Sequence, residues 1–226
     1  MSHYPEVIFI VGRRKVPNST LEWLKQKKRS FEKMWRRYGS DILQRVESAC
    51  GIGFPTFVRE EGIEIWLQRW RREDGGYVGD MIETEPRKFT IYLRKNDSWK
   101  SVKDVIVHEL IHCLMWQVYY YDLRRREVTL FEDYFADELL ASLVEKIVLG
   151  TSLTRRQCAE ALDYAMSKMR LRLGRKNHHK KLIHSIMEFM KIYQRRIRKK
   201  RSDILRERMR VIKELASPLP STLEDL

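Results

Sequence analysis

The chain has few amide side chains and few cysteines. Asparagine and glutamine together number nine among 226 residues, whereas charged residues make up 34%. Thermostable proteins tend toward this balance, so the composition favours a thermophilic source. The three cysteines, Cys50, Cys113 and Cys158, are odd in number and widely scattered. They support neither a disulfide framework nor a cysteine-rich metal site, and we expect a reducing, cytoplasmic setting.

Long apolar runs are also absent. No stretch approaches the roughly 18 consecutive apolar residues of a membrane-spanning helix, so we expect no transmembrane segment. The apolar run at residues 7–12 is short and lacks a basic start, which is typical of a strand rather than a secretion signal.

Positive charge is concentrated in one part of the chain. Residues 168–213 contain 18 basic and three acidic residues, whereas the rest contains 27 basic and 28 acidic residues. The chain therefore combines a nearly neutral body with a basic C-terminal arm. Basic helices can neutralise phosphates, and the densest run is the candidate for non-specific nucleic-acid binding. Its residues are Arg195, Arg196, Arg198, Lys199, Lys200 and Arg201. A solvated face and an anionic membrane surface or protein partner are the alternatives.

Periodicity predicts an α+β fold. Alternation indicates strands at 7–12, 57–60, 63–70, 77–83 and 88–94, and in the last of these Phe89, Ile91 and Leu93 face opposite to Thr90 and Tyr92. Helical spacing indicates helices near 21–49, 99–120, 129–148, 155–173 and 178–215. Ser19 and Thr154 are expected as N-caps, each followed three residues later by Glu or Gln.

The segment VIVHELIHCLMW, residues 105–116, places three ionisable side chains inside an apolar helix. His108 and His112 are four residues apart and share one helix face, so both imidazoles can reach one ion. Glu109 is rotated about 100° from His108, where it can accept a proton from the attacking water. This H-E-x-x-H arrangement predicts one zinc ion per chain with Glu109 as general base. The alternative is a pair of core histidines with local hydrogen bonds.

Catalytic zinc needs a third protein ligand, and the segment FEDYFADELLAS at residues 131–142 offers carboxylates. Here the chain resembles the gluzincins, thermolysin-like metallopeptidases with a second motif E-x-x-A-D or E-x-x-S-D. When this motif is aligned so that Ala136 is its small residue and Asp137 its last acid, the first acid of the motif, which is the zinc ligand, is Asp133. The neighbouring Glu132 has the usual residue type, so both remain candidates. The resemblance implies that Asp137 steadies a zinc-bound histidine.

The resemblance also implies a fold and an activity. It implies a catalytic domain at residues 1–150, with a small mixed or antiparallel sheet packed on an active-site helix and a second, ligand-bearing helix. A helical, basic region would follow at 151–226. Strand 88–94, with Thr90 and Tyr92, would be a substrate-binding edge, and an interior strand is the alternative. The implied function is peptide-bond hydrolysis by a zinc metallopeptidase. The alternatives are a nucleic-acid-binding protein with a structural or degenerate metal site, or a DNA-associated protease similar to the SprT-like proteases, whose usual third histidine is missing here.

Overall fold

The computed structural model describes residues 4–12, 16–71, 79–81, 87–123, 130–150, 154–168, 183–184 and 186–188. Within these ranges, the side chains of residues 79–81, 115–123, 130–137 and 164–168 are not described. The chain divides into two compact units. The first contains residues 1–47 and 53–114, and the second contains residues 48–52 and 115–226. The predicted domains at residues 1–150 and 151–226 stay a prediction.

The first unit is built on a four-stranded mixed sheet with the order β1-β2-β4-β3. β1 (Val7–Val11), β2 (Ile63–Arg69) and β4 (Lys88–Leu93) are parallel, and β3 (Gly79–Met81) is antiparallel to β4. Helices between β1 and β2 return the chain to the same end of the sheet, as a parallel pair requires. The predicted α+β class and mixed sheet are confirmed, and the antiparallel alternative is wrong.

The two faces of this sheet differ as the alternation predicts. Phe9 of β1 pairs with Ile65 of β2, which pairs with Phe89 of β4, and all three are almost fully buried. The intervening Thr90 and Tyr92 are half-buried on the opposite face. One face therefore carries the core of the unit, and the predicted orientation of residues 88–94 is confirmed.

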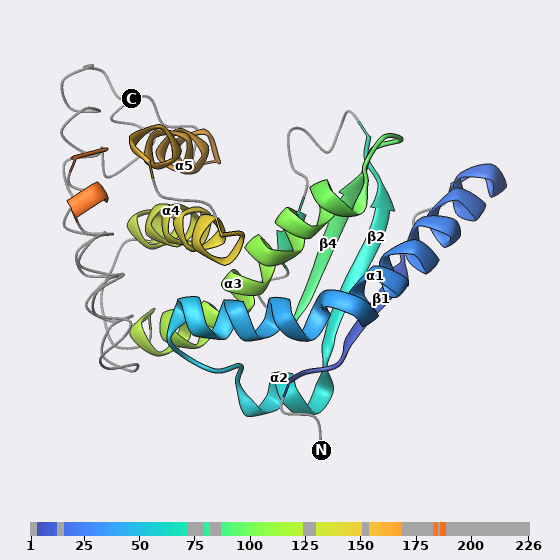
Figure 1. The fold of residues 1–226 in the computed structure, drawn as a ribbon, viewed down its shortest axis with the longest axis horizontal. Helices are drawn as coiled ribbons and strands as arrows, with labels where there is room; N and C mark the ends of the chain where they lie inside the picture. The colour runs from blue at the N-terminus through green and yellow to red at the C-terminus, as the bar shows by residue number, and fades with distance from the viewer. Residues whose placement is uncertain are drawn as a thin grey trace. The chain divides into compact units, whose positions relative to one another are not determined.

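Two helices cover the buried face. Four aromatic rings form a cluster: Phe9 on β1, Phe31 and Trp35 on α1 (Asn18–Cys50), and Trp99 at the start of α3 (Trp99–Leu123). The centroids of neighbouring rings in this cluster lie 6.1–6.5 Å apart. Within this unit, α1 runs across β1 and β2 (Figure 1). This cluster fixes α1 and the first turn of α3 against the same side of the sheet.

β4 is an interior strand, because it pairs with β2 on one side and β3 on the other. The prediction that Thr90 and Tyr92 belong to an edge strand is therefore wrong, and the interior-strand alternative holds. A strand was predicted at residues 77–83, but its pairing partner was not: residues 79–81 form β3 and pair with residues 89–91 of β4. Among the described strands, the edge beside β4 is formed by β3.

Two local predictions near the first helices are wrong. Residues 57–60 were expected as a strand but lie in the short helix α2 (Thr56–Glu61), which begins after Pro55, a residue that favours helix starts. Ser19 was expected as an N-cap, but α1 already begins at Asn18. Here the backbone N–H groups of Thr20 and Leu21 donate to the carbonyl oxygen of Pro17.

Gly62 connects α2 to β2 in a backbone conformation, φ 77° and ψ 179°, that is essentially restricted to glycine. A Cβ atom there would lie 2.9 Å from the carbonyl oxygen of Glu6. Gly150 also has a positive φ, 75°, but no heavy atom lies within 4 Å of its Cβ position. We expect Gly62→Ala to lower the free energy of unfolding by roughly 2–3 kcal/mol and Gly150→Ala by about 1 kcal/mol, as measured by urea titration. Equal losses for the two variants would contradict this explanation of Gly62.

The second unit contains the helices α4 (Leu130–Val148) and α5 (Arg155–Lys168), which pack against each other. The predicted capping box of α5 is confirmed: the backbone N–H of Gln157 donates to Thr154 Oγ1 at 3.3 Å, and that of Thr154 donates to Gln157 Oε1 at 2.9 Å. Within the described residues, no helix has the length and apolar character needed to cross a membrane. The six arm residues between Arg195 and Arg201 lie outside the described residues.

Candidate metal centre

A tight turn places the start of α3 directly after β4. The backbone N–H of Arg94 donates to Asp97 Oδ2 at 2.7 Å, which closes the turn that ends the strand. The carbonyl oxygen of Ser98 then accepts the first helical bond from Val102 N at 3.0 Å. With Trp99 held in the aromatic cluster, the direction of α3 is fixed at its first turn. The helix therefore carries the H-E-x-x-H segment in a fixed relation to the sheet.

Every residue of α3 from Ile106 to Leu114 is buried. A helix that is buried on all sides is normally apolar on all sides. Here the exceptions are His108, Glu109 and His112, whose exposed fractions are only 5%, 4% and 6%. Burying such groups costs several kcal/mol unless they are neutral or compensated by partners. The sequence prediction that this helix is buried is confirmed, and its three polar residues need compensation.

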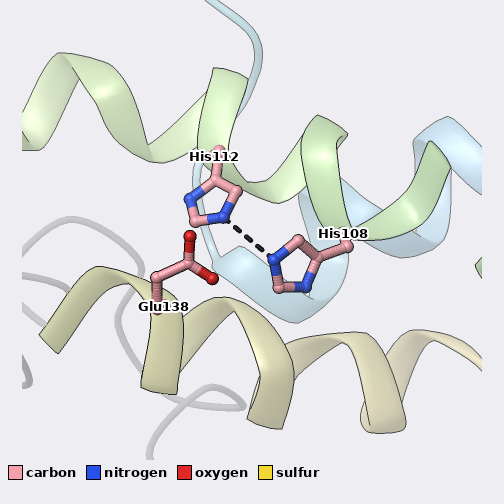
Figure 2. Close-up of side chains that lie close together, drawn as sticks. All are labelled: His108, His112 and Glu138. Carbon is pink, nitrogen blue, oxygen red and sulfur yellow. Dashed lines mark hydrogen bonds between the residues drawn. The ribbon is translucent and has the colours of Figure 1, made fainter. Parts of the chain in front are cut away.

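The two imidazoles point at a common position. Nε2 of His108 and Nε2 of His112 lie 3.0 Å apart, and the two rings, one helical turn apart, meet edge to face with an angle of 78° between their planes (Figure 2). In neutral histidines this contact is a single hydrogen bond, with one Nε2 donating and the other accepting. The same contact brings two potential nitrogen ligands together without any rearrangement of the helix.

The spacing fits a shared zinc ion. Two Zn–N bonds of about 2.0–2.1 Å at a tetrahedral angle separate their nitrogens by roughly 3.3 Å. The observed 3.0 Å differs from that value by a few tenths of an ångström, which small χ rotations of two side chains accommodate. Imidazole nitrogens facing apart would have excluded such a site.

A carboxylate completes the group. Ligand atoms of His108, His112 and Glu138 all lie within 4.8 Å of one another, and the Glu138 carboxyl group points toward the histidines (Figure 2). Two imidazoles with one carboxylate are a donor set found in catalytic zinc sites. The described residues thus contain a group that could hold a metal ion.

The sequence-based candidates for the third ligand were Asp133 and Glu132, with Asp137 as a supporting acid. All three lie on α4, as expected, but their side chains are outside the described residues. Their predicted roles therefore stay predictions. Glu138 is adjacent to Asp137 in sequence and was missed as a candidate ligand.

A signal for Glu138 was present in the sequence. Glu138-Leu-Leu-Ala141-Ser142 matches the pattern E-x-x-A-D in all but its last acid. Ala141 and Ser142 are buried, with exposed fractions of 0% and 5%. Small residues three and four positions after a glutamate leave room beside it on the same helix face. When the pattern is aligned on Glu138, its last position is Ser142 instead of an acid. This alignment therefore supplies no carboxylate that could orient a histidine.

The neighbouring thiol does not belong to the donor set. Cys113 is fully buried, and burial raises the pKa of its thiol to about 12. A thiol binds metal as the thiolate, so Cys113 in its apolar surroundings behaves as a small core residue. Cys50 and Cys158 are also free and buried. These observations agree with the sequence-based exclusion of disulfides for the described part of the chain.

No protein-family model matches the chain, and no curated protein or solved structure is similar enough to count as a match. The interpretation of the site therefore depends on its own residues and geometry.

Proposed function

We propose that the protein is a zinc-dependent metallopeptidase. The observation that carries this proposal is the pair of buried imidazoles with Nε2 atoms 3.0 Å apart, with Glu109 buried on the next residue of the same helix. Two nitrogen donors beside a carboxylate base form the arrangement that hydrolytic zinc sites use to activate water. The resemblance to gluzincins supports the same conclusion from sequence alone.

Charge balance supports a divalent cation at this position. Glu109 has an exposed fraction of only 4%, and Glu138 is half-buried. An ionised carboxylate in this setting loses hydration. A doubly charged cation bound beside His108, His112 and Glu138 would offset that cost. A bound ion would thus add to the compensation of the polar groups within an otherwise apolar stretch of α3.

Each residue has a distinct role in this proposal. His108 and His112 hold the ion through Nε2, and Glu138 supplies the third ligand. The chemistry that a zinc ion held by these residues would supply is Lewis-acid activation of water and of the substrate carbonyl. Glu109 accepts the proton of the attacking water and delivers it to the leaving amine. Asp133 and Glu132 are the competing candidates for the third ligand, and Asp137 would orient a histidine.

The geometry of the sheet bears on where an extended peptide would bind. Peptides add to sheets by pairing with an edge strand. Because β4 is interior, we place the substrate beside β3 (Gly79–Met81), the described strand next to β4 at that edge.

Cleavage of an unstructured protein tests the proposed function. Freshly purified protein without a histidine tag should cleave casein, and 1,10-phenanthroline should abolish the cleavage because it removes zinc. Stoichiometric zinc should restore it, whereas magnesium should not, since a site of two imidazoles and one carboxylate favours zinc over magnesium. Mass spectrometry of the products identifies the bonds broken. Cleavage that persists after complete metal removal would contradict the proposal.

A second candidate is a nucleic-acid-binding protein in which the metal stabilises the fold only. The observation that favours it is the basic arm at residues 168–213, with 18 basic and three acidic residues. This candidate predicts zinc binding without cleavage of any protein. A DNA-associated protease would show zinc binding, cleavage and DNA retention together.

A further inference from the structure

Helix α1 carries a second group of basic residues, far from the arm in sequence and on a different helix from His108 and His112. Residues 25–37 contain seven basic residues and one acidic residue. Five of the basic residues fall within an arc of about 120°, because successive helical residues are rotated by about 100°. We call these five the α1 stripe, and all are exposed: Lys25, Arg29, Lys33, Arg36 and Arg37.

Little within the described chain neutralises the α1 stripe. Lys25 pairs with Glu22 at 2.8 Å, but both side chains are about half exposed, and such surface pairs contribute little. Arg29, Lys33 and Arg36 make no ion pair with any described residue. The stripe therefore offers charge that a partner can neutralise.

The other residues on this face indicate which anionic partner fits. Gln26, Ser30 and Ser40 lie between or beside the basic residues and are exposed, whereas the apolar side chains of α1 such as Leu24 and Phe31 are buried in the unit. An amphipathic membrane helix needs apolar side chains on its exposed side, and the stripe has none. Single-stranded nucleic acids are held by exposed aromatic rings that stack on bases. The guanidinium group of Arg37 lies 5.1 Å from the ring centroid of Tyr38, which is 37% exposed, so one face of this ring is already occupied by the stripe itself. A single ring in this arrangement is not a row of stacking platforms for a single strand.

The shape of the stripe matches a regular array of phosphates. From Lys25 to Arg37 it extends about 18 Å along a continuous helix. Each strand of double-stranded DNA carries one phosphate per roughly 3.4 Å of helix axis, so a stripe of this length would lie beside about five phosphates of one strand. Three of the five residues are arginines, whose guanidinium groups can donate two hydrogen bonds to one phosphate. We propose that the α1 stripe binds the phosphate backbone of a nucleic-acid duplex without reading its bases.

Charge reversal in the full-length protein tests this proposal. The test variant combines Arg29→Glu, Lys33→Glu and Arg36→Glu. The control variant combines Lys95→Glu, Lys100→Glu and Arg155→Glu, which are exposed residues outside the stripe and give the same change in net charge. Binding to a fluorescent 20-base-pair DNA duplex of mixed sequence is followed by anisotropy from 50 to 300 mM salt. Circular dichroism verifies folding, and an Arg29→Gln, Lys33→Gln and Arg36→Gln variant serves if the reversed variant is unfolded.

We expect the stripe variant to bind the duplex at least about 100-fold more weakly at 100 mM salt. The slope of log K against log salt concentration should become shallower by about 2.7, which is the loss of three phosphate contacts. The control should change the affinity by less than about threefold. Equal losses in both variants would show an effect of net charge alone and would overturn the proposal. Unchanged DNA binding in the stripe variant would also overturn the proposal. If that variant at the same time lost retention on phosphatidylserine vesicles, the partner would be identified as a membrane surface.

Discussion

Glu109→Gln is expected to retain one zinc ion per chain and to lose peptidase activity. Glutamine keeps the size of the glutamate side chain and fits the same buried position, where Glu109 has an exposed fraction of 4%. It cannot accept a proton at neutral pH, so the attacking water loses its base. General-base catalysis typically contributes a factor of about 10²–10⁴, and we expect kcat for casein-derived peptides to fall by that factor. The measurement combines steady-state kinetics with elemental analysis of the same sample.

Glu60→Gln is the matched control for this variant. Glu60 is an exposed residue of α2, and its replacement should change neither the metal content nor kcat by more than about twofold. Full activity in Glu109→Gln would exclude Glu109 as the base. Loss of zinc in Glu109→Gln would show that Glu109 contributes to metal binding, which the i, i+4 geometry of His108 and His112 does not require.

His112→Ala is expected to lose the metal. Removing one of two imidazoles whose Nε2 atoms lie 3.0 Å apart leaves a single nitrogen donor on α3. Second-sphere changes already weaken zinc binding by roughly 10–100-fold, so loss of a direct ligand should exceed that range. Zinc affinity is measured by competition with a chromophoric chelator. His184→Ala, at an exposed histidine, is the control and should keep wild-type affinity.

Thermal unfolding reports the same loss independently of activity. A ligand at 100 times its Kd stabilises the folded state by about 2.7 kcal/mol. For a chain of this size, zinc removal should therefore lower Tm by roughly 5–10 °C in the wild-type protein. The same chelator should leave the Tm of His112→Ala unchanged. An equal chelator effect in both proteins would place the stabilising metal elsewhere.

The third ligand is distinguished by the same affinity assay. Glu138→Gln should weaken zinc binding by more than about 100-fold, whereas Asp133→Asn and Glu132→Gln should each have an effect below about tenfold. The opposite result, with Asp133→Asn or Glu132→Gln as the severe variant, would restore the assignment suggested by the E-x-x-A-D register at Ala136 and Asp137. In either case His108 and His112 remain the proposed first two ligands.

The sequence predicted those parts of the structure that depend on local periodicity. Alternation in residues 63–69 and 88–93 is strong, and both segments form strands with the expected faces buried. The spacing of His108 and His112 predicted their common helix face for the same reason, since four residues make about one turn. The Thr154 capping box was also readable, because both of its partners are within three residues.

What the sequence left open depends on contacts between distant residues. A strand was predicted at residues 77–83, and residues 79–81 form β3, but its pairing with residues 89–91, which makes β4 interior, is a contact that no local pattern reveals. Residues 57–60 alternate like a strand, but Pro55 and Gly62 bound a helix too short for helical periodicity to show. Sequence alone does not show which of the acids in residues 131–142 lies beside the histidines, and so Glu138 was missed as a candidate ligand.

Zinc X-ray absorption spectroscopy on protein purified without a histidine tag tests the central claim most directly. We expect one zinc ion per chain, with two imidazole nitrogens at about 2.0–2.1 Å and carboxylate oxygen at about 2.0–2.2 Å. The imidazole signal should disappear together with the metal in His112→Ala. Protein that retains no zinc after metal supplementation, or zinc coordinated without imidazole, would contradict a metal site at His108 and His112.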